Sequence, residues 1–228
     1  MQADFDQYAE NYDESLAIGL AASGENKEFF AQGRVNWLAR KLRERGATAR
    51  RILDYGCGTG GATPFLLALP EAESVLGVDV SASELAVARR TYGGEQASFS
   101  LLADYEPRGE FDLVFCNGVF HHIARDERSA AIDYARQAVR PGGWFALWDN
   151  NPWNPGARYV MHKCPFDCEA VMVSASEMCK LLRANGCEVI DVSFQFIFPR
   201  ALRWLRPLET SLARWPLGAQ YQVMGRRR

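Results

Sequence analysis

The sequence predicts an α/β protein in which a mostly parallel β-sheet lies between two layers of helices. Two observations predict this fold. Short apolar runs with strand character alternate with longer stretches of helical character from residue 50 onward. The first of these runs leads directly into a glycine-rich loop and then a helix, which marks where the sheet begins.

The individual elements follow from hydrophobic periodicity and from end signals. Asn26 is a candidate N-cap for a long helix that Gly46 closes, and Ser81 and Glu84 have the spacing of a capping box. Helices are expected at residues 5–20, 27–45, 61–69, 82–92, 126–139 and 175–184. Strands are expected at residues 51–55, 75–79, 97–102, 111–116, 143–149, 188–198 and 221–224.

The glycine-rich loop at residues 56–61 is the first candidate binding element. Gly56, Gly58 and Gly60 alternate between the first strand and the following helix. Without a Cβ, these residues allow a ligand to approach the backbone closely, and the helix start offers unpaired N–H groups. Gly56, Gly58 and Gly61 also fit the dinucleotide-binding pattern, and a turn without a ligand is a third reading.

Acidic residues near the strand ends favour a nucleoside ligand. Asp54 precedes the first glycine, and Asp79 ends the second apolar run. A carboxylate at that second position can accept hydrogen bonds from two ribose hydroxyls. Asp104 and Asn117 fall at the ends of the next two predicted strands. Because ligands of such sheets bind at the carboxyl ends of the strands, we expect these side chains to share one site.

Composition limits the class of protein. The 228 residues fit one α/β domain, and a net charge of −2 argues against general affinity for nucleic acid. The sequence has no apolar run of membrane-spanning length, and its first residues lack a signal-peptide pattern. We therefore expect a cytoplasmic protein.

The cysteines are expected to be reduced thiols, and we predict no metal site. Four of the six lie in or beside apolar runs, where small buried residues are common. Cys164 and Cys168 have a loose ligand-like spacing, but no second pair completes a zinc site. The cysteines are at positions 57, 116, 164, 168, 179 and 187.

Five motifs in order resemble class I S-adenosylmethionine-dependent methyltransferases, over roughly residues 8–149. They are Leu53-Asp54-x-Gly56-x-Gly58-x-Gly60, Gly77-Val78-Asp79-Val80-Ser81, Ala103-Asp104, Phe111-Asp112-Leu113-Val114 and Val139-Arg140-Pro141-Gly142-Gly143. The resemblance implies a Rossmann-like three-layer sandwich with a seven-stranded, mostly parallel sheet and an antiparallel last strand. It also implies an N-terminal helical cap at 1–47 and a methyltransferase domain at 48–228, with pocket-side insertions at about 150–173 and 199–218.

The same resemblance implies S-adenosylmethionine as cofactor and S-adenosylhomocysteine as product. Asp54 would orient the loop or the cofactor's ammonium, Asp79 would bind the ribose, and Asp104 would accept a hydrogen bond from the adenine. The cofactor-binding residues that it implies are Tyr12, Asp54, Gly56, Cys57, Gly58, Gly60, Asp79, Val80, Asp104, Tyr105, Cys116 and Asn117.

Three residues are candidate general bases. His121 and His122 follow the fourth strand, where the methyl acceptor would lie, and Asp149 ends the fifth. A neutral imidazole could take a proton from a hydroxyl or amine, whereas the alternative is that the histidines are scaffold. In the insertion, the residues expected to line the acceptor pocket are His162, Lys163, Phe166 and Asp167. Arg34 lies on the more polar side of its helix, where we expect a solvated side chain, and the alternative is contact with an acidic substrate.

The function expected is direct SN2 methyl transfer to a small molecule or metabolite, with oxygen as the acceptor atom. The sequence does not encode which acceptor it is, whether a base is needed, or the oligomeric state. Two alternatives remain open at this point: an NAD-dependent dehydrogenase that uses the same glycine loop, and a catalytically inactive S-adenosylmethionine-binding protein.

The C-terminal stretch has its own signature. Residues 199–228 contain seven arginines and one glutamate, together with Trp204 and Trp215. A basic stretch rich in Trp and Leu can lie on an anionic membrane surface. The alternative is a helical pair that packs on the acceptor pocket or forms a dimer contact.

Overall fold

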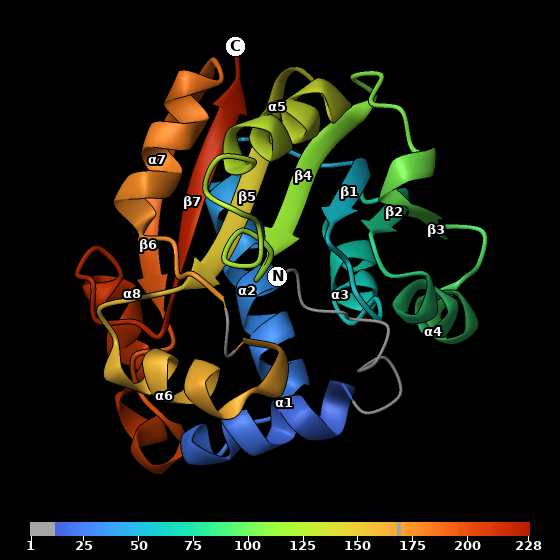
Figure 1. The fold of residues 1–228 in the computed structure, drawn as a ribbon. Helices are drawn as coiled ribbons and strands as arrows, with labels where there is room; N and C mark the ends of the chain where they lie inside the picture. The colour runs from blue at the N-terminus through green and yellow to red at the C-terminus, as the bar shows by residue number, and fades with distance from the viewer. Residues whose placement is uncertain (1–11, 168–169) are drawn as a thin grey trace.

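The computed structural model describes residues 12–167 and 170–228 of the chain. Its centre is a seven-stranded sheet in the order β3-β2-β1-β4-β5-β7-β6 (Figure 1). The strands from β3 to β5 are parallel to their neighbours, whereas β7 is antiparallel to both β5 and β6. The strands are β1 Arg51–Tyr55, β2 Ser74–Asp79, β3 Ala97–Leu101, β4 Phe111–Asn117, β5 Val139–Asn150, β6 Cys187–Gln195 and β7 Gln220–Arg227. This confirms the expected fold class.

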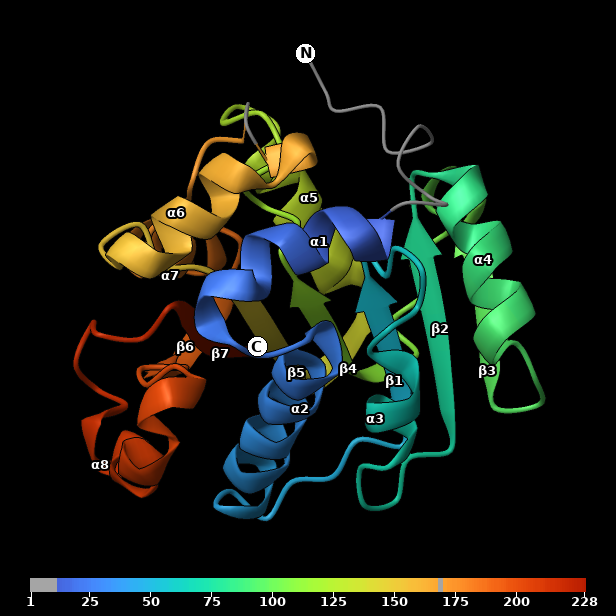
Figure 2. The same cartoon turned by 90° about the horizontal axis from the view of Figure 1, so that it is seen from below.

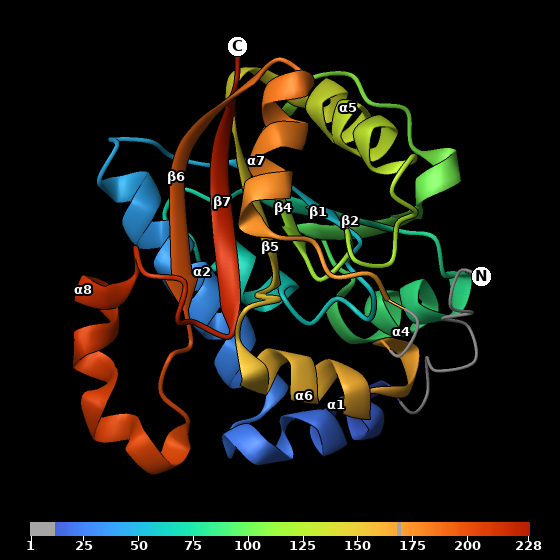
Figure 3. The same cartoon turned by 60° about the vertical axis from the view of Figure 1, so that its left-hand side comes forward.

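Helices form the two outer layers. The α-helices are α1 Tyr12–Leu20, α2 Lys27–Arg43, α3 Thr63–Leu67, α4 Ala82–Tyr92, α5 Arg128–Ala138, α6 Pro155–Lys163, α7 Ala175–Ala184 and α8 Glu209–Leu212. The 3-10 turns are η2 Ala21–Ser23, η3 Leu102–Asp104, η4 Pro165–Asp167 and η5 Arg200–Leu208. Figures 1 and 3 show α5 and α7 on one face of the sheet and α2 and α3 on the other.

Two apolar clusters join these layers to the sheet. On one face, Ile132 of α5 and Leu182 of α7 are completely buried in one cluster with Val114 of β4. On the other face, Leu38 of α2 is completely buried in a cluster with Ile52 of β1. The sheet is therefore covered on both sides, as expected for parallel strands made of continuous apolar runs.

Two further helices cover the carboxyl ends of the parallel strands. Helices α1 and α6 lie side by side across this edge, as the view from below shows (Figure 2). The helix predicted over residues 5–20 is described from Tyr12 onward, and its earlier part lies outside the described residues. Helix α2 serves two purposes, because its C-terminal half packs on the sheet while its first turns reach the same edge as α1.

The expected helix caps are present. Asn26 Oδ1 accepts a hydrogen bond from Phe29 N at 3.0 Å at the start of α2. Ser81 Oγ accepts one from Glu84 N at 3.1 Å at the start of α4, which is the first half of the predicted capping box. These bonds satisfy N–H groups that have no partner within their own helix.

Three strand boundaries differ from the prediction by three residues or more, and one of them is the end of β7, at Arg227 rather than at residue 224. Strand β5 begins at Val139 rather than at residue 143, because Val139 already pairs with Phe111 and the residues up to Gly143 bulge out before pairing resumes at Trp144. Strand β6 ends at Gln195 rather than at residue 198. Phe196 has a left-handed backbone (φ 61°), which turns the chain out of the sheet.

The C-terminal insertion lies beyond the edge strand β6 (Figure 3). Its position is fixed by Glu209 Oε1, which accepts a hydrogen bond from Phe198 N at 2.9 Å, and by Arg206, which pairs with Glu25 at 2.8 Å. Trp204 and Trp215 remain 72% and 63% exposed. In the part of the chain that is described, no helix has both the length and the apolar character needed to cross a bilayer.

Candidate active site

A cavity of about 800 Å³ lies at the carboxyl ends of the parallel strands. Its floor is the glycine-rich loop after β1 and the ends of β2 and β4, and helices α1 and α6 close it from the other side. This volume falls within the range of natural small-molecule pockets, which is about 300–1,000 Å³. The topology therefore brings the predicted strand-end residues to one place.

The glycine loop owes its shape to residues without side chains. Gly56 has φ 72°, and a Cβ built on it would lie 2.2 Å from Val119 Cγ2. Gly58 also has a left-handed backbone, with φ 52°. Gly56 and Gly58 line the cavity, whereas Gly60 faces inward, where a Cβ would meet Tyr92 at 3.0 Å and Ala88 at 3.1 Å. Gly60 therefore allows the loop to pack against α4 and is not part of the cavity lining.

Asp79 braces this loop from the end of β2. Its Oδ2 accepts a hydrogen bond from Gly58 N at 2.8 Å, and its Oδ1 accepts one from Ser81 N at 3.0 Å. Each carboxylate oxygen can accept more than one hydrogen bond. Asp79 can thus hold the loop and still accept bonds from a ligand in the cavity that it lines.

Asp54 and Arg34 place opposite charges on the cavity wall. Asp54 is 2% exposed, and its buried Oδ2 makes no hydrogen bond within the described structure. Burial and the nearby Asp79 raise the pKa of Asp54 to about 7, against the opposing effect of Arg34. The expectation that Arg34 is solvated is wrong, because it is only 9% exposed and its Nη1 donates to Gln220 Oε1 at 3.0 Å.

This pair suits the amino-acid end of S-adenosylmethionine. A buried carboxylate oxygen without a hydrogen bond favours a cationic group, and the guanidinium of Arg34 favours a carboxylate. Both groups line the cavity beside the glycine loop, where the backbone lies open to a ligand. The residues present therefore fit a zwitterionic α-amino acid joined to a nucleoside.

Some of the other predicted cofactor residues line the cavity and others do not. Cys57, Val80 and Asn117 line the cavity, and Val80 keeps 55% of its surface exposed there. Cys116 is completely buried in the core. Of Tyr12, the structure describes only the backbone, at the start of α1.

Asp104 and Tyr105 lie apart from the cavity lining in the described structure. Asp104 is exposed on η3. The Tyr105 hydroxyl donates to Glu110 Oε1 at 3.1 Å, and its ring packs against the core. Leu102, from the same turn, does line the cavity.

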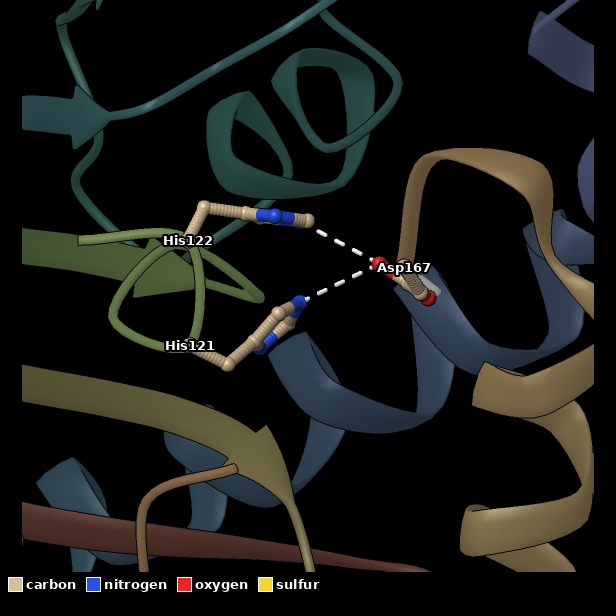
Figure 4. A group of neighbouring side chains, drawn as sticks. All are labelled: His121, His122 and Asp167. Carbon is tan, nitrogen blue, oxygen red and sulfur yellow. Dashed lines mark ion pairs between the residues drawn. The ribbon is translucent and has the colours of Figure 1, made fainter. Parts of the chain in front are cut away.

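The two histidines belong to a buried polar cluster with two aspartates. Nδ1 of His121 lies 2.6 Å from Asp149 Oδ1, behind the cavity wall. Asp167 Oδ1, from η4, lies 3.4 Å from His121 Nε2 and 3.2 Å from His122 Nε2 (Figure 4). His121, His122 and Asp167 line the cavity, whereas Asp149 is fully buried and reaches it only through His121.

The charges within this cluster depend on one another. Burial alone would lower the pKa of His121, but Asp149 and Asp167 raise it to about 10. Burial dominates at His122 and lowers its pKa. Burial would raise the pKa of Asp167, yet the two histidines lower it to about 2. His121 is therefore a cation between two carboxylates, and His122 is the neutral histidine.

An aromatic group forms another part of the cavity lining. The ring centroids of Phe30 and Phe196 are 4.9 Å apart, and those of Phe29 and Phe30 are 5.3 Å apart. Phe196 reaches this place because α2 has a glycine, Gly33, beside it, where a Cβ would lie 2.7 Å from the Phe196 ring. The strained backbone of Phe196 is thus tied to the shape of the site.

Sequence reasoning missed the aromatic group and the link between the histidines and Asp167. Phe196 was expected inside a strand, and Asp167 was expected only near the acceptor. Asp167 is far from His121 along the chain, and no local pattern predicts their contact. Arg34 was misjudged because the helix pattern does not show that the cavity covers its polar side.

Comparison with known proteins agrees with this geometry. A family model described as a methyltransferase domain matches residues 52–143. The chain is 30% identical over 179 residues to a ubiquinone biosynthesis O-methyltransferase from Pseudomonas aeruginosa, and the match covers 70% of this chain and 72% of that protein. It is 31% identical over 155 residues to a trans-aconitate 2-methyltransferase from Methylobacterium nodulans, covering 63% of this chain and 59% of that protein.

Other relatives extend beyond this chain. A match to an uncharacterised Synechococcus protein covers only 24% of that protein. Among solved structures, a methyltransferase from Thermotoga maritima superimposes with a TM-score of 0.68 at 18% identity, covering 98% of each chain, and so shares the fold. The identity and coverage of the Pseudomonas aeruginosa match establish the family. The chain belongs to the class I S-adenosylmethionine-dependent methyltransferases.

Proposed function

We propose that this chain transfers a methyl group from S-adenosylmethionine to a hydroxyl oxygen of a small molecule with an apolar body. One observation carries the proposal. A wall suited to the cofactor and a buried His–Asp cluster line the same cavity. Holding both reactants in one enclosed space removes the entropic cost of bringing them together, which can lower the activation free energy by several kcal/mol.

The cofactor would occupy the side of the cavity next to the glycine loop. When bound, its sulfonium supplies an electrophilic methyl group. Asp54 and Arg34 would hold the amino-acid ends, and Asp79 would accept the ribose hydroxyls. Val80 and Leu102 offer apolar surface for the base. Each of these five residues lines the cavity.

The acceptor would lie between the histidines and the aromatic group. Its oxygen forms the new bond to carbon, the sulfur–carbon electron pair stays on sulfur, and the hydroxyl proton is lost. His121, His122 and Asp167 are polar groups of the cavity wall, and Asp149 holds His121 in place. The cluster is therefore assigned to orient the hydroxyl and to assist removal of its proton.

Two observations support an apolar acceptor that reacts at oxygen. Phe29, Phe30 and Phe196 offer ring faces and edges on which a planar apolar body can pack. The relative from Pseudomonas aeruginosa is named as an O-methyltransferase of ubiquinone biosynthesis. The trans-aconitate relative is named for a different acceptor, so the acceptor differs among the relatives.

The proposal is tested by incubating the purified chain with methyl-deuterated S-adenosylmethionine and a panel of phenols, carboxylic acids and amines. We expect labelled methyl ethers of phenols in the mass spectrum. Labelled products only from amines would overturn the assignment of oxygen as the acceptor atom. Labelled products only from carboxylic acids would overturn the assignment of a hydroxyl group. Binding of S-adenosylhomocysteine without transfer to any acceptor would mean that the chain only binds the cofactor.

We also propose that the C-terminal insertion contacts anionic membrane surfaces. Trp204, Leu208, Trp215 and Leu217 are each at least half exposed in a segment that also carries Arg200, Arg203, Arg206 and Arg214. Exposed aromatic and aliphatic side chains beside arginines suit the boundary between lipid head groups and acyl chains. Such contact would place the cavity near acceptors that partition into lipid.

A further inference from the structure

Three ligand-type side chains converge at the cavity wall. His121, His122 and Asp167 each offer one atom, and these atoms lie within 4.8 Å of one another. The two histidines extend from the loop after β4 toward Asp167 on η4, as Figure 4 shows. Two imidazoles and one carboxylate that meet in this way form a donor set that binds divalent transition metals in proteins.

The hydrogen bonding of Asp167 is incomplete. Its Oδ1 is buried and lies within 3.4 Å of both histidine rings, yet it makes no hydrogen bond of acceptable geometry within the described structure. A buried carboxylate needs a compensating cation, and a metal ion bound here would replace the proton of His121 in that role. The carboxylate and the two rings are thus directed at a common region.

A second carboxylate holds one of the rings. Asp149 Oδ1 lies 2.6 Å from Nδ1 of His121, which leaves Nε2 directed at the cavity. A carboxylate on the far nitrogen is the usual support of a metal-bound histidine, because it fixes both the tautomer and the ring orientation. The cluster thus contains both the ligand set and the group that orients it.

We propose that His121, His122 and Asp167 bind one divalent transition-metal cation of the zinc type. Three protein ligands leave a coordination position open toward the cavity, as in catalytic zinc sites. This site differs from the sequence-based expectation of no metal, because the third ligand comes from the insertion. Cation binding itself does not depend on the identity of the reaction.

The role of the cation in catalysis rests on the proposed function. A hydroxyl placed at the open position would become more acidic, because the cation stabilises the oxygen anion. The hydroxyl proton then passes to solvent, the oxygen forms its bond to the methyl carbon, and the sulfur keeps the electron pair of the broken bond. The products are the methyl ether, S-adenosylhomocysteine and one proton.

The test measures metal binding directly. The full chain is stripped with a chelator and titrated with Zn²⁺ in competition with a chromophoric chelator, and Co²⁺ is used as a spectroscopic probe. We expect one equivalent of Zn²⁺ and weak visible Co²⁺ bands without a strong sulfur-to-cobalt charge-transfer band. A strong charge-transfer band would place the cation on cysteines and overturn the proposal.

Variants locate the site. His122→Gln and Asp167→Asn should each weaken Zn²⁺ binding at least about 100-fold, since loss of a ligand should cost more than loss of a supporting group. The matched control is His162→Gln, because His162 is the chain's third histidine, is exposed on α6 and should leave affinity unchanged. Absence of stoichiometric binding to the wild type would overturn the proposal, as would wild-type affinity in both ligand variants.

Calorimetry with S-adenosylhomocysteine separates failure of this inference from failure of the proposed function. It also shows whether each variant is folded. Cofactor binding without metal binding would refute the cation site and leave methyl transfer intact. Metal binding without cofactor binding would refute the proposed function and leave the cation site standing. If a variant fails to fold, the Co²⁺ spectrum of the wild type still decides between nitrogen–oxygen and sulfur ligands.

Discussion

Asp149 Oδ1 lies 2.6 Å from Nδ1 of His121, and both side chains are almost completely shielded from solvent. The contact joins the end of β5 to the loop that follows β4. It therefore fixes a histidine of the cavity wall to the central sheet. Its removal should affect both stability and chemistry.

Asp149→Asn should lower the free energy of unfolding by about 1–3 kcal/mol, because a buried charged partner of His121 is lost. It should also lower kcat, while the affinity for S-adenosylhomocysteine stays close to that of the wild type. Urea unfolding and calorimetry measure the two effects. Asp133→Asn is the control, because Asp133 is 39% exposed and its pair with Arg136 should contribute less than about 1 kcal/mol. Equal losses of unfolding free energy in Asp149→Asn and Asp133→Asn would contradict a special structural role of the Asp149–His121 contact.

Gly56→Ala should disrupt the glycine-rich loop at residues 56–61. The left-handed backbone at Gly56 disfavours any side chain, and the new Cβ would lie 2.2 Å from Val119 Cγ2. We expect a loss of about 1–3 kcal/mol in stability from overpacking and weaker binding of S-adenosylhomocysteine. Gly94→Ala is the control, because a Cβ there meets nothing within 4 Å, its φ is not left-handed and it is not part of the cavity lining. Calorimetry that finds the two variants alike would contradict the role of Gly56.

Asp54 should make stability depend on pH. Its pKa of about 7 in the folded protein exceeds the ordinary value, so between about pH 4 and pH 7 the folded state binds more protons than the unfolded state. Stability should therefore fall as pH rises through this window, by up to about 4 kcal/mol at this site. Asp54→Asn should remove this fall, and chemical unfolding at pH 5 and pH 8 measures it.

The same group should make cofactor binding depend on pH in the opposite direction. The carboxylate form of Asp54 would attract the cofactor's ammonium, so affinity for S-adenosylhomocysteine should increase as pH rises from 5.5 to about 7.5, through the pKa of Asp54. Calorimetry of the wild type and Asp54→Asn over this range tests the idea. A pH profile that is the same in both proteins would exclude Asp54 from the ammonium site.

Phe196→Ala should change the acceptor site and spare the cofactor site. Loss of a ring that packs on Phe30 and Phe29 removes apolar contact area from the cavity wall. We expect KM for the acceptor to rise about tenfold, which corresponds to about 1.4 kcal/mol. The dissociation constant of S-adenosylhomocysteine serves as the internal control. If it rises as much as KM, the ring supports the whole cavity and not the acceptor.

The C-terminal insertion should bring the protein to anionic vesicles. In a flotation assay, the wild type should rise with vesicles that contain anionic lipid and remain behind with purely zwitterionic vesicles. The double variant Trp204→Ser, Trp215→Ser should float less, because both indoles are exposed. An absence of co-flotation of the wild type at low salt would end this idea.

The sequence by itself determined the fold class and the meeting of the glycine loop with two strand-end carboxylates. Strand–helix alternation from residue 50 predicts a parallel sheet, and in a parallel sheet the carboxyl ends of the strands meet at one edge. Asp54, Gly56 and Asp79 could therefore be placed together from their positions in the chain alone. The family comparison then confirms S-adenosylmethionine, rather than NAD, as the cofactor.

Only the tertiary structure decided which other residues share the cavity wall with these strand ends. Asp167 meets the two histidines, Phe196 meets α2, and Arg34 turns into the cavity because segments far apart in the chain fold over the same edge of the sheet. No local periodicity records such contacts, since they depend on how α6, η4 and the end of β6 pack. Several side chains that we propose to contact the acceptor come from these covering segments, whereas the strand ends that we propose for the cofactor follow the regular pattern of the chain.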